Sequence, residues 1–221
     1  YHVTTGYLGD HRFPLLKKSA DGMRKTLNQN GAKKILAFFD ENSHDDGRFD
    51  TGHTVVQSDY SFLLNRVIEN PNIGLILKPK VPISLRRRLG SVCELLDLAL
   101  STGRCMVLEG GDLQGSRTPA EAAMASDIAI HSSLIAATAA VEAVLSGTPT
   151  LLMDHAGWPS SPLYALGEGI VVFKDWTSLW DACLEFMADS NAVNGFGDWS
   201  IMKEELDPFR DGQAARRMGT Y

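Results

Sequence analysis

Short apolar runs alternate along the chain with longer segments whose apolar residues recur at helical spacing. Each run is four to six residues long, is rich in Ile, Leu, Val, Met or Phe, and predicts a buried strand. The runs cover residues 34–39, 74–78, 105–108, 127–130, 150–153 and 169–173. The longer segments predict helices at residues 60–69, 91–100, 135–145 and 178–188. A further short helix is predicted where Thr118 and Pro119 supply a polar cap and a proline at the first helical position.

Strands that alternate with helices of this length indicate βαβ units. The predicted fold is therefore α/β: a Rossmann-like parallel sheet of about six strands with helices on both faces, followed by a C-terminal helical segment. In open sheets of this kind, ligands bind in the crevice beyond the carboxyl ends of the strands. Binding and catalytic residues are therefore expected directly after each apolar run.

Composition narrows the possible partners and compartments. The net charge is −6, and the longest basic run is Arg86–Arg88, so a nucleic acid bound through a broad basic face is excluded. No apolar run is long enough to cross a bilayer. The three cysteines lie far apart without CxxC spacing, which excludes a zinc site or a disulfide framework. They predict reduced, buried thiols and a cytoplasmic protein.

The predicted helix at residues 135–145 is apolar except for Thr138 and Glu142. These two residues are four apart and therefore share one face of the helix. An unpaired carboxylate is costly to bury, so Glu142 must face solvent, a partner or a ligand. From the pattern alone, two interpretations stay open: Thr138 and Glu142 form the solvent-exposed face of a surface helix, or they belong to a binding site.

Four motifs carry a resemblance to a known family. Glu142, Gly147 and Pro149 form E-x4-G-x-P before an apolar strand, and residues 125–133 read ASDIAIHSS. Both resemble the nucleotide-binding segment of GT-B glycosyltransferases, such as the N-acetylglucosaminyltransferase of lipid II synthesis and the Kdo transferases. Residues 3–7, VTTGY, look like the family's interdomain linker strand. Residues 211–217 resemble the D-G-x-A-x-x-R run of bacterial polymer-building transferases.

The resemblance implies roles for several residues. Glu142 would accept hydrogen bonds from the ribose hydroxyls of a nucleotide sugar, and a polar turn with a helix N-terminus would hold the diphosphate. The turn stands about one helical turn farther from Glu142 than is common in the family. Two sets of diphosphate contacts therefore stay open. These are Ala137 and Thr138 at the helix start, or His131, Ser132 and Ser133 in the preceding turn.

Other candidates follow the strands. Lys78 and Lys80 would neutralise the leaving diphosphate, or else lie in a solvated loop. Gly110 would allow the backbone to approach the base closely, or simply form a turn. In the acidic stretch at residues 40–46, Glu41 and His44 are candidates for deprotonating an acceptor hydroxyl, with an exposed turn as the alternative. Arg86–Arg88 are expected to form a surface charge cluster, or else to meet an anionic lipid headgroup or acceptor.

Together these features predict the donor half of a GT-B glycosyltransferase. Residues 1–32 would be the interdomain linker and first helix, 33–190 the nucleotide-sugar-binding domain, and 191–221 a C-terminal extension. The enzyme would transfer a sugar from a nucleoside diphosphate sugar to a polysaccharide or lipid-linked acceptor in bacterial cell-surface glycan synthesis. We expect no cofactor and no metal ligand, since the family generally works without a metal.

The remaining partner would be an N-terminal acceptor domain that is missing from this chain. We also expect the protein to make peripheral contact with the inner face of the membrane. Two alternatives remain. One is an enzyme of the UDP-GlcNAc 2-epimerase type, whose usual glycine-rich turn and Glu pair are replaced here by AATAA at residues 136–140. The other is a non-catalytic domain that binds a nucleotide or a glycan.

Overall fold

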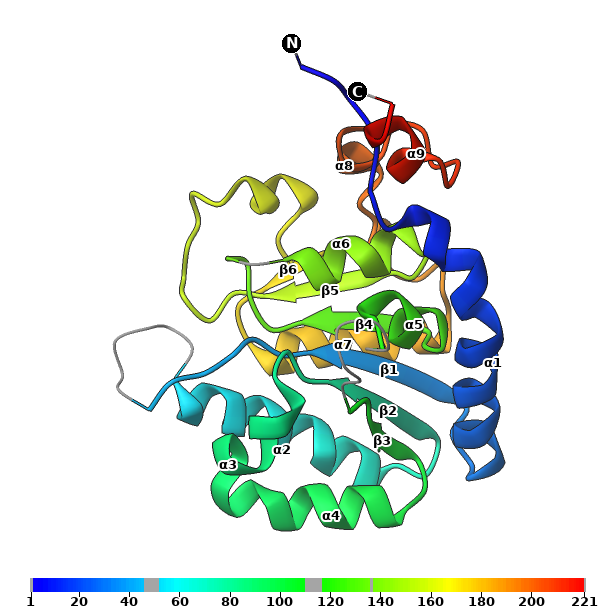
Figure 1. Cartoon of the computed structure of the whole chain (residues 1–221). Coiled ribbons are helices and arrows are strands. Elements are labelled where there is room, and N and C mark those ends of the chain that lie inside the picture. Colours follow the sequence, from blue (N-terminus) through cyan, green and yellow to red (C-terminus); the bar gives the residue numbers. More distant parts are fainter. Residues whose placement is uncertain (1, 46–51, 110–116, 136, 221) are drawn as a thin grey trace.

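A six-stranded parallel sheet forms the centre of the molecule (Figure 1). The computed structural model describes residues 2–45, 52–109, 117–135 and 137–220. The strand order is β3-β2-β1-β4-β5-β6, and every neighbouring pair is parallel. The strands are β1 Lys34–Phe39, β2 Ile73–Lys78, β3 Cys105–Val107, β4 Ile128–His131, β5 Thr150–Met153 and β6 Val172–Phe173. The strand order reverses between β1 and β4, which makes their carboxyl ends the switch point where open α/β sheets bind ligands.

Helices cover both faces of the sheet (Figure 1). The α-helices of the described residues are α1 Phe13–Gln29, α2 His53–Glu69, α3 Leu85–Leu89, α4 Cys93–Ser101, α5 Pro119–Met124, α6 Thr138–Leu145, α7 Trp176–Ala188, α8 Ser200–Leu206 and α9 Ala214–Met218, of which α8 and α9 lie beside the N-terminal segment, beyond the sheet. Short 3-10 helices lie at η1 Asp10–Arg12, η2 Pro82–Ser84, η3 Gly90–Val92 and η4 Pro162–Leu166. The predicted α/β fold, with a Rossmann-like parallel sheet and helices on both faces, is confirmed.

Alternation along β1 explains why its sequence is continuously apolar. Leu36 and Phe38 face the core built with α2, α4 and α7. Ile35 and Ala37 face the opposite core, built with α1, α5 and α6. A central parallel strand is buried on both faces, so both sets of alternating side chains must be apolar.

Three predicted boundaries differ from the structure by three residues or more. The helix predicted from residue 135 begins at Thr138, because the Ser133 hydroxyl accepts a hydrogen bond from the Ile135 N–H (3.0 Å) and holds a turn there. The sixth strand is only Val172–Phe173, since the Gly169 N–H bonds to the Val172 carbonyl in a tight loop. Helix α2 begins at His53, well before residue 60.

The residues that follow α7 pack directly against strand β5 of the sheet. The buried Trp199 indole N–H donates to the Thr150 carbonyl (3.0 Å). The Gly197 carbonyl accepts from the Thr150 N–H (3.2 Å). Gly197 has φ +62°, and a Cβ there would lie 2.7 Å from the Thr150 nitrogen, so this approach requires glycine. The chain after α7 thus contributes a large aromatic side chain to the core.

No helix in the described part of the chain is both long and apolar enough to cross a membrane.

Candidate functional site

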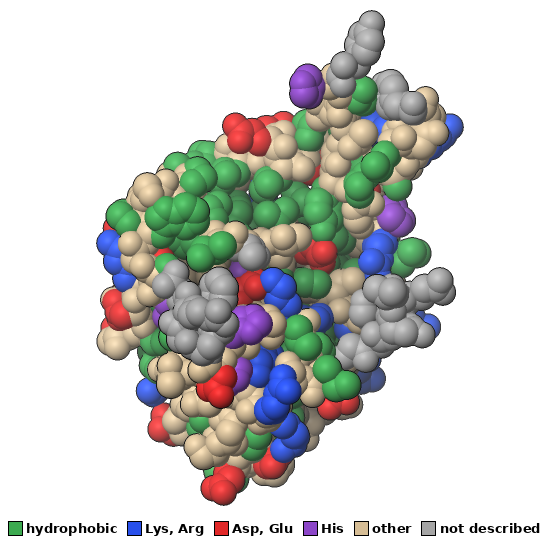
Figure 2. Space-filling view, turned by 60° about the vertical axis from the view of Figure 1, so that its left-hand side comes forward, with side chains coloured by type: hydrophobic (Ala, Val, Ile, Leu, Met, Phe, Trp, Pro, Cys, Tyr) green, Lys and Arg blue, Asp and Glu red, His purple; other side chains and the backbone are tan. Residues whose placement is uncertain are grey.

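A pocket of about 220 Å³ opens at the carboxyl ends of β1 and β2, beside the start of α6. It is lined by Phe39, Asp40, Glu41, Lys78, Lys80, Pro119, Thr138, Ala139 and Glu142. Figure 2 looks toward this end of the sheet and shows basic, acidic and histidine side chains gathered below a broad hydrophobic area. The pocket brings together five residues that the sequence singled out at widely separated positions, namely Glu41, Lys78, Lys80, Thr138 and Glu142.

Glu142 lies half-buried on α6 and lines this pocket. Its Oε1 accepts a hydrogen bond from the Tyr7 hydroxyl (2.8 Å), and its Oε2 accepts one from the Ala120 N–H (3.3 Å). Ala120 is in the first turn of α5, where N–H groups have no partner within the helix. The carboxylate thus stabilises the start of α5 and also presents an edge to the pocket.

The start of α6 offers backbone donors to the same pocket. Ala137 is the N-cap residue and provides no side-chain cap, while the exposed Thr138 is the first helical residue. Free N–H groups and the positive end of the helix dipole favour an anion at this point. The sequence left two candidate sets of diphosphate contacts open. Of these, Ala137 and Thr138 are the residues at the start of the helix, where an anion is favoured.

His131, Ser132 and Ser133 are buried in the turn after β4 and make internal contacts. The Ser132 hydroxyl accepts from the Glu41 N–H (3.2 Å), and His131 Nδ1 lies 2.8 Å from the Ser133 carbonyl oxygen. The two serines line a neighbouring cavity of about 20 Å³ that also includes Glu41. This turn holds Glu41 in place and lies apart from the wall of the larger pocket.

Glu41 is the acid of the predicted catalytic pair that reaches the pocket. Its carboxylate forms an ion pair with Lys80, and its Oε1 lies 3.4 Å from His131 Nε2. Burial acts to raise the pKa of Glu41, but the hydrogen bonds and charges of His131 and Lys80 outweigh it and hold the pKa below its usual value. Glu41 is therefore ionised at neutral pH and is a weak base.

Lys78 lies half-buried in the pocket wall, where its ammonium group donates to the Pro79 carbonyl (3.1 Å). Burial lowers the pKa of Lys78, while the charges of Asp40 and Glu142 oppose that shift. Among the ion pairs between described residues, none uses Lys78, whereas Lys80 is paired with Glu41. Lys78 is thus placed to meet an anionic ligand.

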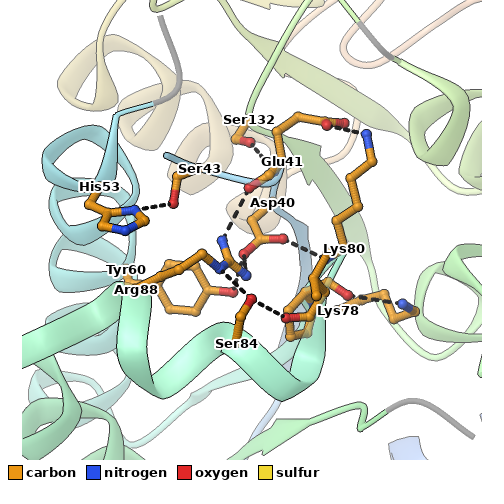
Figure 3. A network of polar contacts seen from close by, with 12 residues as sticks. Asp40, Glu41, Ser43, His53, Tyr60, Lys78, Lys80, Ser84, Arg88 and Ser132 are labelled. Atoms are coloured by element: carbon orange, nitrogen blue, oxygen red, sulfur yellow. Dashed lines mark hydrogen bonds and ion pairs between the residues drawn. The ribbon is translucent and has the colours of Figure 1, made fainter. Parts of the chain in front are cut away.

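A buried ionic network behind the pocket was missed by the sequence analysis (Figure 3). Arg88 pairs with Asp40 (2.9 Å), which also accepts from the Tyr60 hydroxyl (3.0 Å) and the Lys80 N–H (2.6 Å). Arg88 further donates to the Glu41 carbonyl (3.2 Å). The expectation of a surface cluster is thus wrong for Arg88. Its position three residues after the apolar Leu85, on the same face of the helix, was the available signal in the sequence.

The other predicted residues lie elsewhere. His44 is exposed, forms a backbone bridge with Gly52, and is not part of the pocket wall. Gly110 lies outside the described residues. Tyr7 was recognised only as part of a linker-like motif, and no local signal in the sequence connects it with Glu142. Within the described residues, no group of three or more His, Cys, Asp or Glu side chains is arranged to hold a metal ion.

Comparison with known proteins yields a likeness of fold to solved structures. No family model and no curated protein sequence matches the chain. The chain is similar to the crystal structure of Anabaena Alr3699/HepE in complex with UDP and glucose, with 16% sequence identity and a TM-score of 0.51. The similarity covers 92% of this chain and 52% of that one, so this chain spans about half the length of its neighbour. At this identity the likeness shows a shared fold: the chain is built like about half of a protein whose structure holds UDP and glucose.

Proposed function

We propose that this chain is the donor-binding domain of a glycosyltransferase, which binds a nucleoside diphosphate sugar for transfer to a glycan or lipid-linked acceptor. One observation carries the proposal. The pocket at the carboxyl ends of β1 and β2 brings together a carboxylate, the start of a helix and two lysines. These groups are suited to bind ribose hydroxyls, phosphate and the diphosphate charge, respectively. The shared fold with a structure that holds UDP and glucose supports the same conclusion.

The parts of the pocket match the parts of such a ligand. The diphosphate would lie between the first turn of α6 and the ammonium groups of Lys78 and Lys80. The ribose would reach Glu142, whose carboxylate oxygens each have a second acceptor site beyond the bonds from Tyr7 and Ala120. Lysines can balance the diphosphate charge without a metal ion.

In the transfer step, an acceptor hydroxyl would attack the anomeric carbon and lose its proton, while the bond from that carbon to the phosphate oxygen breaks. The electron pair of the broken bond goes to the diphosphate, where positioned cations stabilise the growing charge. Glu41 is a poor proton acceptor because its pKa is held low. We assign to Glu41 the role of positioning Lys80. A second domain of the GT-B type would bind the acceptor and supply the base that deprotonates the acceptor hydroxyl.

Calorimetric titration of UDP, CDP, GDP and ADP into the chain tests this function. One diphosphate should bind with micromolar to millimolar affinity. Replacing Glu142 with Ala should weaken binding roughly tenfold or more, because a hydrogen bond to a charged group contributes about 1.5–3 kcal/mol. Glu142→Gln, which keeps an acceptor for the Ala120 N–H, separates loss of charge from loss of the α5 contact.

Glu185→Ala, an exposed change on α7, is the matched control and should leave the affinity unchanged. Circular dichroism confirms that each variant is folded. A folded wild-type chain that binds none of the four diphosphates contradicts the proposed function.

A further inference from the structure

The N-terminal segment reaches the pocket through one side chain. Residues 2–6 approach η1 and α1 without regular secondary structure, and Figure 1 shows this segment beside α8 and α9. The half-buried Tyr7 stacks on Phe13 (ring centroids 6.1 Å apart) and donates its hydroxyl to Glu142 Oε1. Burial, and then the charge of Glu142, raises the pKa of Tyr7, so the hydroxyl keeps its proton and stays a donor at neutral pH.

The C-terminal residues hold this segment in place. Arg217 donates to the Thr5 carbonyl (3.2 Å), pairs with Asp211, and lies over the Phe209 ring at 3.8 Å. The Gly212 N–H donates to Asp10 Oδ2 (2.8 Å). We call residues 207–217 the C-terminal clasp. The D-G-x-A-x-x-R run thus contacts the N-terminal segment at Thr5 and the following 3-10 helix η1 at Asp10.

The fit between the two ends is close. Gly6 has φ +89°, and a Cβ there would lie 2.7 Å from Asp207 Oδ1 and 3.4 Å from the Ala214 Cβ. A larger residue could neither adopt this backbone conformation easily nor leave Asp207 in place. The clasp therefore determines where the backbone stands one residue before Tyr7.

We propose that Tyr7 is a positioning residue for the ribose-binding carboxylate of Glu142, and that the C-terminal clasp acts on the donor site by holding Tyr7 there. The inference rests on the proposed function and adds a part of the chain that does not line the pocket.

The physical reason is preorganisation. A glutamate side chain loses considerable rotamer freedom when it is fixed by a ligand. In this structure the Tyr7 hydroxyl and the Ala120 N–H already hold one acceptor site on each carboxylate oxygen. The remaining acceptor sites would meet ribose hydroxyls without further ordering of the side chain, so binding would avoid part of that entropic cost.

The test is a double-mutant cycle, measured by calorimetry with the same four nucleoside diphosphates. Tyr7→Phe removes only the hydroxyl and should raise the Kd about three- to tenfold, the range expected for one lost hydrogen bond. In a Glu142→Ala background the same change should have no further effect, because the carboxylate that Tyr7 positions is gone. Tyr164→Phe is the matched control, since its hydroxyl donates to Asp154 (2.6 Å) away from the pocket.

Arg217→Gln tests the clasp. It should raise the Kd in the wild-type background and leave it unchanged in the Tyr7→Phe background. Equal affinity of wild type and Tyr7→Phe, or fully additive effects of Tyr7→Phe and Glu142→Ala, would overturn the inference while leaving the proposed function intact. Failure of the wild-type chain to bind any of the four diphosphates would overturn both.

Discussion

Arg88 of α3 and Asp40 at the end of β1 form an ion pair whose two side chains are each only 1% exposed. Such a pair must lose its hydration on folding, and it is held here by several additional hydrogen bonds. The bonds reach the backbone of Lys80 and Glu41, so the pair connects a buried charge with the wall of the pocket.

Removing one member of this pair should destabilise the fold strongly. Arg88→Met leaves the Asp40 carboxylate buried without its counter-ion, and we expect a loss of about 3–5 kcal/mol in the free energy of unfolding. Urea denaturation followed by circular dichroism measures it. Arg86→Met, which breaks the exposed pair with Asp97, is the control and should have a much smaller effect. Similar losses in the two variants would mean that the buried network contributes little.

Lys78 should contribute more to binding a diphosphate than a monophosphate. Lys78→Gln removes the pocket cation that no described acid pairs with, so UDP affinity should fall about tenfold and UMP affinity less. Calorimetry with both nucleotides gives the ratio. Lys25→Gln, an exposed change on α1, should leave both affinities as they are. An equal loss for UMP and UDP would place Lys78 away from the second phosphate.

Glu41 should make stability depend on acid pH. Its folded pKa is held below the unfolded value, so its contribution is fully present above about pH 4.3 and is lost as the pH falls through the folded pKa. The stability difference between wild type and Glu41→Gln should therefore be largest near neutral pH and shrink toward pH 3. Unfolding curves at several pH values measure this difference, with Glu185→Gln as the control. A difference that grows on acidification contradicts the assigned pKa shift.

The cysteines should differ in reactivity. Burial raises the pKa of the Cys105 thiol to about 12 and also raises that of Cys183, so neither forms thiolate at pH 8. Cys93 is half-buried at the start of α4. Ellman's reagent should label no more than Cys93 in the native protein and all three thiols in denaturant. Rapid native labelling of Cys105 or Cys183 would show that the core opens locally.

The sheet was predictable because its strands are buried on both faces and therefore read as unbroken apolar runs. The start of α2 was not, since the segment from His53 to Ser58 carries few apolar residues and begins at a glycine rather than a capping side chain. The pocket was largely predictable, because strand ends of a parallel sheet meet at one edge. The bond from Tyr7 to Glu142 spans 135 positions. Only the tertiary packing of the N-terminal segment reveals it.

The two ends of the described chain lie close together, and the clasp joins them (Figure 1). A protein shortened after Leu206 would keep every residue that lines the pocket, yet it would lose the contacts that Arg217 makes with the N-terminal segment and Gly212 with η1. Tyr7 would then be free to leave Glu142. Residues that never meet the nucleotide would in this way set how tightly it is held, and the minimal functional unit would extend beyond the part of the chain that forms the sheet.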